Sequence, residues 1–333
     1  MSLRTLAIDW SGAATGAKRK IWLAEAAEGQ IIRLESGRGR EETAQFLIDE
    51  SSRTPELVVG LDFAFSLPGW FLESRGLADG PALWDLVADE GEAWLAGCES
   101  PFWGRPGRGR PSLPDHLRRT DRDAPAIGGI RPKSVFQIGG AGAVGTGSLR
   151  GMPILKRLRD AGFSVWPFGA PRWPCVVEIY PRLLTGAVNK GSREARTAYL
   201  GEHHPMLADD VLRLAASSED AFDAAVSALA MDAARAELLN LSTLDDLQSR
   251  QEGQIWAPVT HVVHPDGQPK ARSAAPRSQT GVRDLETWRV MIATMLPTPV
   301  VDLEGGSLVG GEPGEVGVDI GADAIRVCQY ATR

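Results

Sequence analysis

The chain has 333 residues, with 36 Lys and Arg against 43 Asp and Glu, so its formal charge at pH 7 is −7. Hydrophobic residues make up 43% and charged residues 24%, proportions of a folded globular protein that exclude a chain disordered throughout. The acidic balance does not favour general coating of nucleic acid. No apolar run approaches the roughly 20 residues of a membrane-spanning helix, so we expect no membrane partner.

The N-terminal residues and the cysteines indicate the cellular location of the protein. Residues 1–10 form a short apolar run without the long apolar segment or small-residue cleavage site of a signal peptide. The cysteines are odd in number and widely spaced, which argues against a disulfide framework or a zinc site. They are Cys98, Cys175 and Cys328. We therefore expect a cytoplasmic protein.

The first sixty residues predict part of an α/β sheet. Four strand-like apolar runs occur, and a helix with apolar positions at helical spacing precedes the last of them. The helix is predicted at 41–51, and the strands at 3–8, 20–26, 30–34 and 57–61. The order is therefore strand, strand, strand, helix, strand.

The rest of the chain predicts a long insertion and then a mostly helical half. Residues 66–150 are rich in Gly, Pro and Trp, and we expect an insertion there, with a helix at 80–97 and an arginine-rich loop at 105–122. Its tryptophans suit the core or a contact between subunits, so a homo-oligomer is compatible with the sequence. After it we predict an extended piece at 163–167, a strand at 174–179, and helices at 152–161, 193–200, 205–215 and 218–239.

The C-terminal part of the chain predicts an extension of the main domain. We place one domain over residues 1–260 and expect the extension, residues 261–333, to pack on it. A helix is predicted at 285–295, and the segment 317–321 reads as the edge of a hairpin.

Three acidic residues close, or nearly close, apolar strands: Asp9, Asp62 and Glu178. Sites in α/β sheets form just outside strand ends. A carboxylate that is partly desolvated there needs a hydrogen-bond donor, a cation or a proton. Any one of these residues is readily explained as a cap or a turn. Three of them in the same context favour a functional site.

The helix predicted from residue 218 adds further acids. Residues 221–236 are apolar almost all the way round, so this helix should be buried. Asp223 lies inside that apolar surface and needs compensation. Asp220 lies three residues earlier on the same face, although helix capping and the helix dipole also explain it.

Six short motifs occur in a specific order between about residues 3 and 260. They are AIDWSG (7–12), GLDFA (60–64), SVFQ leading into GGAGAVG (134–145), EIYP (178–181), DAFDA (220–224) and EGQI (252–255). With these motifs the chain resembles the DUF429 family of predicted nucleases, within the RNase H-like superfamily. The resemblance implies an α/β RNase H-like fold with helices flanking a mixed five-stranded sheet of order 3-2-1-4-5. Its first three strands would form an antiparallel meander, with the other two parallel to the first.

The resemblance also implies a metal centre. In this superfamily, carboxylates from the first strand, the fourth strand and the last helix hold divalent metals; here these are Asp9, Asp62 and Asp223, with Asp220 as a fourth candidate. Glu178 belongs to the family's own motif and joins the catalytic candidates. Oxygen ligands suit Mg²⁺ or Mn²⁺, which could activate water for phosphodiester hydrolysis. The expected substrate is nucleic acid.

Two glycine-containing turns are candidates for binding a phosphate. The residues Gly140, Gly142 and Gly145 match GxGxxG, but no opening βαβ unit precedes them and no acid follows the next extended piece, which argues against a dinucleotide site. The glycine-rich loop over 139–151 could instead offer backbone N–H groups to a phosphate. The turn at Ser11 and Gly12 could do the same.

The arginine-rich loop allows two interpretations. It could clamp a phosphate backbone through Arg105, Arg108 and Arg110, or it could be a solvated insertion, as charge runs usually are. Both interpretations stay open on the sequence alone.

Two other functions also remain open. The turn after the first strand fits an actin-like or sugar-kinase-like phosphotransferase, but that class needs a second phosphate hairpin, and the sequence has one good copy. A non-catalytic binding protein would keep the acids for structure alone. Protection by ATP against unfolding would favour the phosphotransferase, and insensitivity to divalent metals would favour the binding protein.

Overall fold

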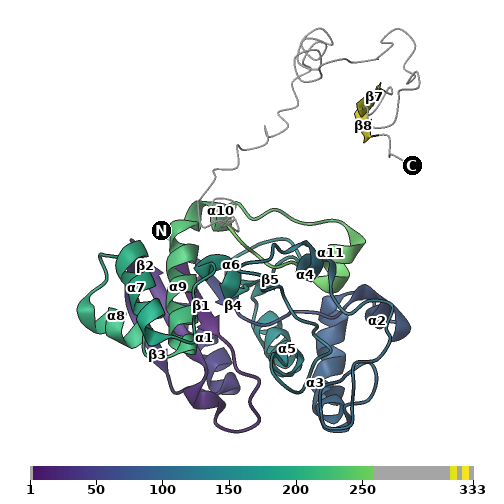
Figure 1. Ribbon diagram of the computed structural model, residues 1–333, viewed down its shortest axis with the longest axis horizontal. Helices are drawn as coiled ribbons and strands as arrows, with labels where there is room; N and C mark the ends of the chain where they lie inside the picture. Colours follow the sequence, from purple (N-terminus) through teal and green to yellow (C-terminus); the bar gives the residue numbers. More distant parts are fainter. Residues whose placement is uncertain (1–2, 259–315, 321–324, 330–333) are drawn as a thin grey trace. The chain divides into compact units, whose positions relative to one another are not determined.

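A mixed sheet of six strands forms the centre of the domain in the computed structural model, which describes residues 3–258, 316–320 and 325–329 (Figure 1). The sheet order is β3-β2-β1-β4-β6-β5. The strands are β1 (Arg4–Asp9), β2 (Trp22–Ala27), β3 (Gln30–Ser36), β4 (Leu57–Leu61), β5 (Ser164–Val165) and β6 (Cys175–Glu178).

The topology agrees with the predicted one except at one edge. Strands β1, β2 and β3 form an antiparallel meander, and β4, β6 and β5 run parallel to β1. The predicted count of five strands is wrong by one. The segment expected only as an extended piece, Ser164–Val165, pairs with Cys175 and Val176 and becomes a sixth strand outside β6.

Helices cover both faces of the sheet, because side chains alternate along each strand. Leu6 and Ile8 of β1 belong to the core under one set of helices, whereas Ala7 belongs to the core under the other. The first core packs against α1 (Arg40–Arg53), α3 (Gly80–Gly97) and α5 (Val144–Asp160). The second packs against α7 (Arg193–His203), α8 (Asp209–Ala215) and α9 (Glu219–Ala233), which Figure 1 shows grouped together near β1 and β2.

Short helices connect these layers, and two of them differ from the predicted elements. Helix α4 (Arg119–Asp123) lies partly inside the segment expected as a loop, because the Asp121 side chain accepts a hydrogen bond from the Arg118 main chain and caps it. The single helix expected over 218–239 is divided at Ala234 into α9 and α10 (Arg235–Leu239). The others are η1 (Ala17–Arg19), α2 (Gly69–Ser74), α6 (Pro181–Thr185) and α11 (Leu247–Glu252).

Helix α5 begins at Val144, eight residues before the predicted start at 152. Eight of the thirteen residues in the expected glycine-rich loop, residues 144–151, are therefore helical. A Cβ at Gly12 would lie 2.4 Å from the main-chain nitrogen of Gly147. Glycine at position 12 thus lets the loop after β1 pack directly on the first turn of α5.

A second glycine sets the distance between α9 and the sheet. A Cβ at Gly60 of β4 would lie 2.6 Å from Met231 Sδ of α9 and 2.9 Å from Ile179 Cγ2. Because glycine has no Cβ, α9 can approach β4 closely. This packing holds the N-terminal part of α9, with Asp220 and Asp223, near the strand ends.

The C-terminal segment is described only in part. The hairpin edge expected at 317–321 coincides largely with β7 (Val316–Ile320), which pairs antiparallel with β8 (Ile325–Gln329). The helix expected at 285–295 lies outside the described residues, and the packing of the extension on the domain stays a prediction. Among the described residues, no helix is long and apolar enough to cross a membrane.

Candidate active site

Three aspartates meet where β1, β4 and α9 come together. Asp9 is the last residue of β1, and Asp62 follows β4, its main-chain N–H donating to Ile8 O at 3.1 Å. Strands β1 and β4 are parallel, so their carboxyl ends share one edge of the sheet. Asp223 lies in the second turn of α9, which begins after Ser218, the cap whose hydroxyl accepts from Ala221 N at 3.0 Å. The structure therefore brings together the three residues expected as metal ligands.

Burial and mutual repulsion raise the pKa of each of these carboxyl groups. Asp9 and Asp223 are each 8% exposed, and Asp62 borders a cavity. Burial first, then Asp62, Asp223 and Asp220, raise the pKa of Asp9 well above its usual range. Burial and Asp223 raise the pKa of Asp62 to about 8. Among the described residues no donor hydrogen-bonds the carboxylate of Asp9 or Asp62, so the charged cluster is costly without a cation.

One lysine provides a partial counter-charge. Lys190 Nζ lies 2.6 Å from Asp223 Oδ2, and this ion pair opposes the effect of burial on the pKa of Asp223, which is nevertheless raised. The other oxygen, Asp223 Oδ1, is buried without a hydrogen-bond partner. Nothing in the sequence singled out Lys190, because a lone lysine between two helices carries no pattern.

Asp220 lies at the margin of the cluster. It is more exposed than Asp223, one turn nearer the start of α9, and burial raises its pKa while Lys20 opposes the rise. Its charge also raises the pKa of Asp9 and Asp62. Asp220 is thus close enough to influence the cluster electrostatically.

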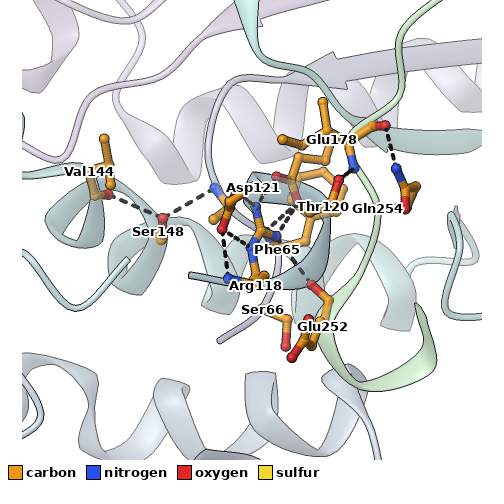
Figure 2. Close-up of polar contacts among 12 residues, drawn as sticks. Phe65, Ser66, Arg118, Thr120, Asp121, Val144, Ser148, Glu178, Glu252 and Gln254 are labelled. Carbon is orange, nitrogen blue, oxygen red and sulfur yellow. Dashed lines mark hydrogen bonds and ion pairs between the residues drawn. The ribbon is translucent and has the colours of Figure 1, made fainter. Parts of the chain in front are cut away.

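Glu178, the third strand-end acid, has a different environment. Arg118 Nη2 donates to its Oε1 at 2.5 Å, Arg118 Nη1 to its Oε2 at 2.8 Å, and Phe65 N to Oε2 at 2.9 Å. Figure 2 shows the Arg118 side chain between Glu178 and Asp121. Both oxygens of Glu178 are therefore occupied by donors, an arrangement suited to holding the end of β6 in place.

Arg118 uses all five of its guanidinium N–H groups. It makes a bidentate pair with Asp121 at 3.0 and 2.8 Å, another with Glu178, and donates to Glu252 O at 3.2 Å. Burial alone would lower the pKa of Arg118, but Asp121 and Glu178 raise it well above its ordinary value. The arginine is 1% exposed and stays charged, so it is a fixed structural cation.

The EGQI motif (252–255) is hydrogen-bonded to the same network. Glu252 accepts from Gly69 N at 2.8 Å and from Arg119 N at 2.6 Å, thereby joining α2 and α4 to α11. Ile255 N donates to Thr120 Oγ1 at 2.9 Å. The contacts of this motif are structural.

A cavity of about 490 Å³ opens beside Asp62 and Glu178. Two lysines, Lys20 and Lys133, lie on its wall, together with the side chains of Trp10 and Tyr180. The phosphate candidates Ser11 and Gly12 line it too, as do Thr146 and Gly147 of the first turn of α5. The loop after β1 and the start of α5 thus form one side of the cavity.

The other phosphate candidates lie elsewhere. Gly145 is buried inside α5, and Gly140 and Gly142 are exposed. The three exposed arginines lie in, or just after, a turn closed by the hydrogen bond from Gly104 N to Arg108 O, and none of them is among the residues lining the cavity. They are Arg105, Arg108 and Arg110. Arg118, the arginine of this segment that does reach the cavity, was not among the candidates.

Known proteins give no direct assignment of the site. Comparisons with protein-family models, with curated proteins and with solved structures found no match. Within the described part of the chain, no group of three or more His, Cys, Asp or Glu side chains has the arrangement of a ready metal site. Any functional assignment therefore depends on the chemistry of the carboxylate cluster and the cavity.

Proposed function

We propose that the chain is a divalent-metal-dependent nuclease of RNase H-like fold, related to the DUF429 family. The observation that carries this proposal is the convergence of Asp9, Asp62 and Asp223 at the strand ends, where burial and repulsion raise the pKa of each. Such a cluster destabilises the fold and has no evident structural purpose. A bound divalent cation would offset the repulsion between the carboxylates.

The donor set fits Mg²⁺ or Mn²⁺. All candidate ligands are carboxylate oxygens, which these ions prefer. Asp223 Oδ1 is a buried oxygen without a hydrogen-bond partner, as expected of a metal ligand. Asp9, Asp62 and Asp223 would hold the ion, with Asp220 as a further ligand. When bound, the ion would activate a water and stabilise the leaving oxygen in phosphodiester hydrolysis.

The cavity supports a phosphate-bearing substrate. Lys20 and Lys133 would attract the phosphate, and the half-buried Tyr180 ring offers a surface for a base. A volume of about 490 Å³ lies within the range of pockets for small ligands. It suits one nucleotide unit of a flexible strand better than an intact duplex, so we favour single-stranded nucleic acid.

The remaining residues of the site keep this geometry in place. Arg118 and Glu178 fix the end of β6 beside Asp62, and Ser148 of α5 accepts from Ala64 N at 3.2 Å, which ties the segment after β4 to α5. In this proposal Glu178 is a positioning residue, because its oxygens are already bonded to Arg118.

The test is cleavage of fluorescently labelled single-stranded DNA and RNA with Mg²⁺, with Mn²⁺ and with EDTA. Wild-type protein should cleave one of these substrates only with metal, and Asp9→Asn should lose that activity. Asp89→Asn, which removes an exposed aspartate of α3, is the matched control and should remain active. Undiminished cleavage by Asp9→Asn, or no cleavage by the wild type with either metal, would contradict the proposal.

A further inference from the structure

We propose that Lys190 is a built-in counter-ion of the carboxylate cluster, which a divalent cation must displace from Asp223 in order to bind. The inference rests on the proposed function, because the competing cation is the one that Asp9, Asp62 and Asp223 would hold. It adds a regulatory element: the protein's own ammonium group sets the metal concentration at which the site fills.

The contact is shielded from solvent. Lys190 Nζ lies 2.6 Å from Asp223 Oδ2, and the two side chains are 11% and 12% exposed. An exposed ion pair contributes little, whereas a shielded one is screened much less by water and salt. The ammonium is therefore the cation in direct contact with Asp223, whereas the Arg182 guanidinium lowers the pKa of Asp223 only through space.

Two arginines hold the backbone that carries Lys190. Arg196 of α7 is 5% exposed and donates to Lys190 O, while its Nε and Nη2 donate to Ala216 O at 3.2 and 2.9 Å. Arg182 of α6 donates to Gly186 O at 3.2 Å and to Val188 O at 2.9 Å. The segment is thus fixed before and at Lys190, so the position of the ammonium group is set in advance by the fold.

This arrangement makes the two cations competitors. Asp223 Oδ2 is bonded to Lys190, and a divalent ion needs the oxygens of the same carboxylate. An ammonium group and a divalent ion on one carboxylate repel each other, so binding of one lowers the affinity for the other. Lys190 also explains why the acids can pack together before any metal arrives.

The experiment compares Mn²⁺ binding by calorimetry in the full-length wild type, Lys190→Met and Lys156→Met. Methionine keeps an unbranched side chain of similar length and removes the charge. Lys190→Met should bind Mn²⁺ about tenfold more tightly and should melt at a lower temperature than the wild type without metal. Lys156→Met, which removes an ammonium group paired with Asp160 on α5 and outside the residues that line the cavity, should leave the Mn²⁺ affinity unchanged.

The outcomes separate this inference from the proposed function. If the wild type binds Mn²⁺ and Lys190→Met binds it no more tightly, the competition is refuted and the metal site stands. If neither protein binds Mn²⁺, both proposals fall. The double variant Lys190→Met with Asp223→Asn guards against a folding defect: it should regain the melting temperature lost by Lys190→Met alone, and a failure to regain it would contradict the counter-ion role.

Discussion

Replacing Asp62 by asparagine should make the metal-free protein more stable, although the residue belongs to the proposed site. Burial and Asp223 raise the pKa of Asp62 from 3.8 to about 8. The folded protein therefore holds a proton that the unfolded chain releases above pH 4. Stability falls as the pH rises through this interval, and the loss is complete above pH 8. An asparagine side chain cannot ionise, so the Asp62→Asn variant avoids that loss.

The size of the gain follows from the same numbers. The difference between 3.8 and about 8 corresponds to at most ~6 kcal/mol, at about 1.36 kcal/mol per pKa unit. Asp62 borders the cavity, where solvent screens its charge, so we expect a gain of about 1–3 kcal/mol in the free energy of unfolding at pH 8.5. At pH 4 the gain should nearly vanish.

Urea unfolding in EDTA at pH 4, 7 and 8.5, followed by tryptophan fluorescence, measures this difference. Asp89→Asn on the exposed side of α3 is the control, and it should stay within about 0.5 kcal/mol of the wild type at each pH. An Asp62→Asn protein that is less stable than the wild type at pH 8.5, or a gain independent of pH, would refute the argument from repulsion.

Three further substitutions test the packing around the site, each by urea unfolding at pH 7. Arg118→Met should lower the free energy of unfolding by about 3–5 kcal/mol because it leaves buried carboxylates unpaired. An unchanged free energy of unfolding would contradict the role of Arg118 as their partner. Gly60→Ala should cost about 1–3 kcal/mol of stability through its clash with Met231. The control Gly169→Ala, with open space around its Cβ, should be nearly neutral, and equal effects of the two would argue against the close approach of α9. Gly201→Ala, exposed in α7 with nothing near its Cβ, should gain about 0.5–1 kcal/mol, and a loss would show an unseen constraint there.

The sequence predicts the sheet well where pattern and packing agree. Strand β4 and helix α3 have the predicted bounds, because the apolar run of 57–61 and the apolar spacing of 80–97 match their burial. Helix α5 was predicted to start too late. Gly145, Gly147 and Pro153 are poor helix formers. A Cβ at Gly145 would lie 2.0 Å from Val135 O, so close packing requires glycine at that position in the first turn.

The site could be predicted only in part, because a local sequence pattern does not show which residues contact one another in the fold. Asp62 and Glu178 both close buried strands, yet Glu178 is bonded to Arg118, 60 residues earlier in the chain, and Asp62 has no such partner among the described residues. Lys190 pairs with Asp223, which lies 33 residues later in the chain, so no local spacing reveals the contact. The proposed relation to the DUF429 family names the acids as site candidates but does not specify these long-range contacts.

Mn²⁺ calorimetry on the wild type and Asp9→Asn shows whether the three aspartates hold a divalent cation. Asp89→Asn serves as the control for loss of one negative charge. We expect saturable binding by the wild type and the control, and at least about tenfold weaker binding by Asp9→Asn, since direct ligands contribute more than the outer groups around them. Equal Mn²⁺ affinity in the wild type and Asp9→Asn would contradict it.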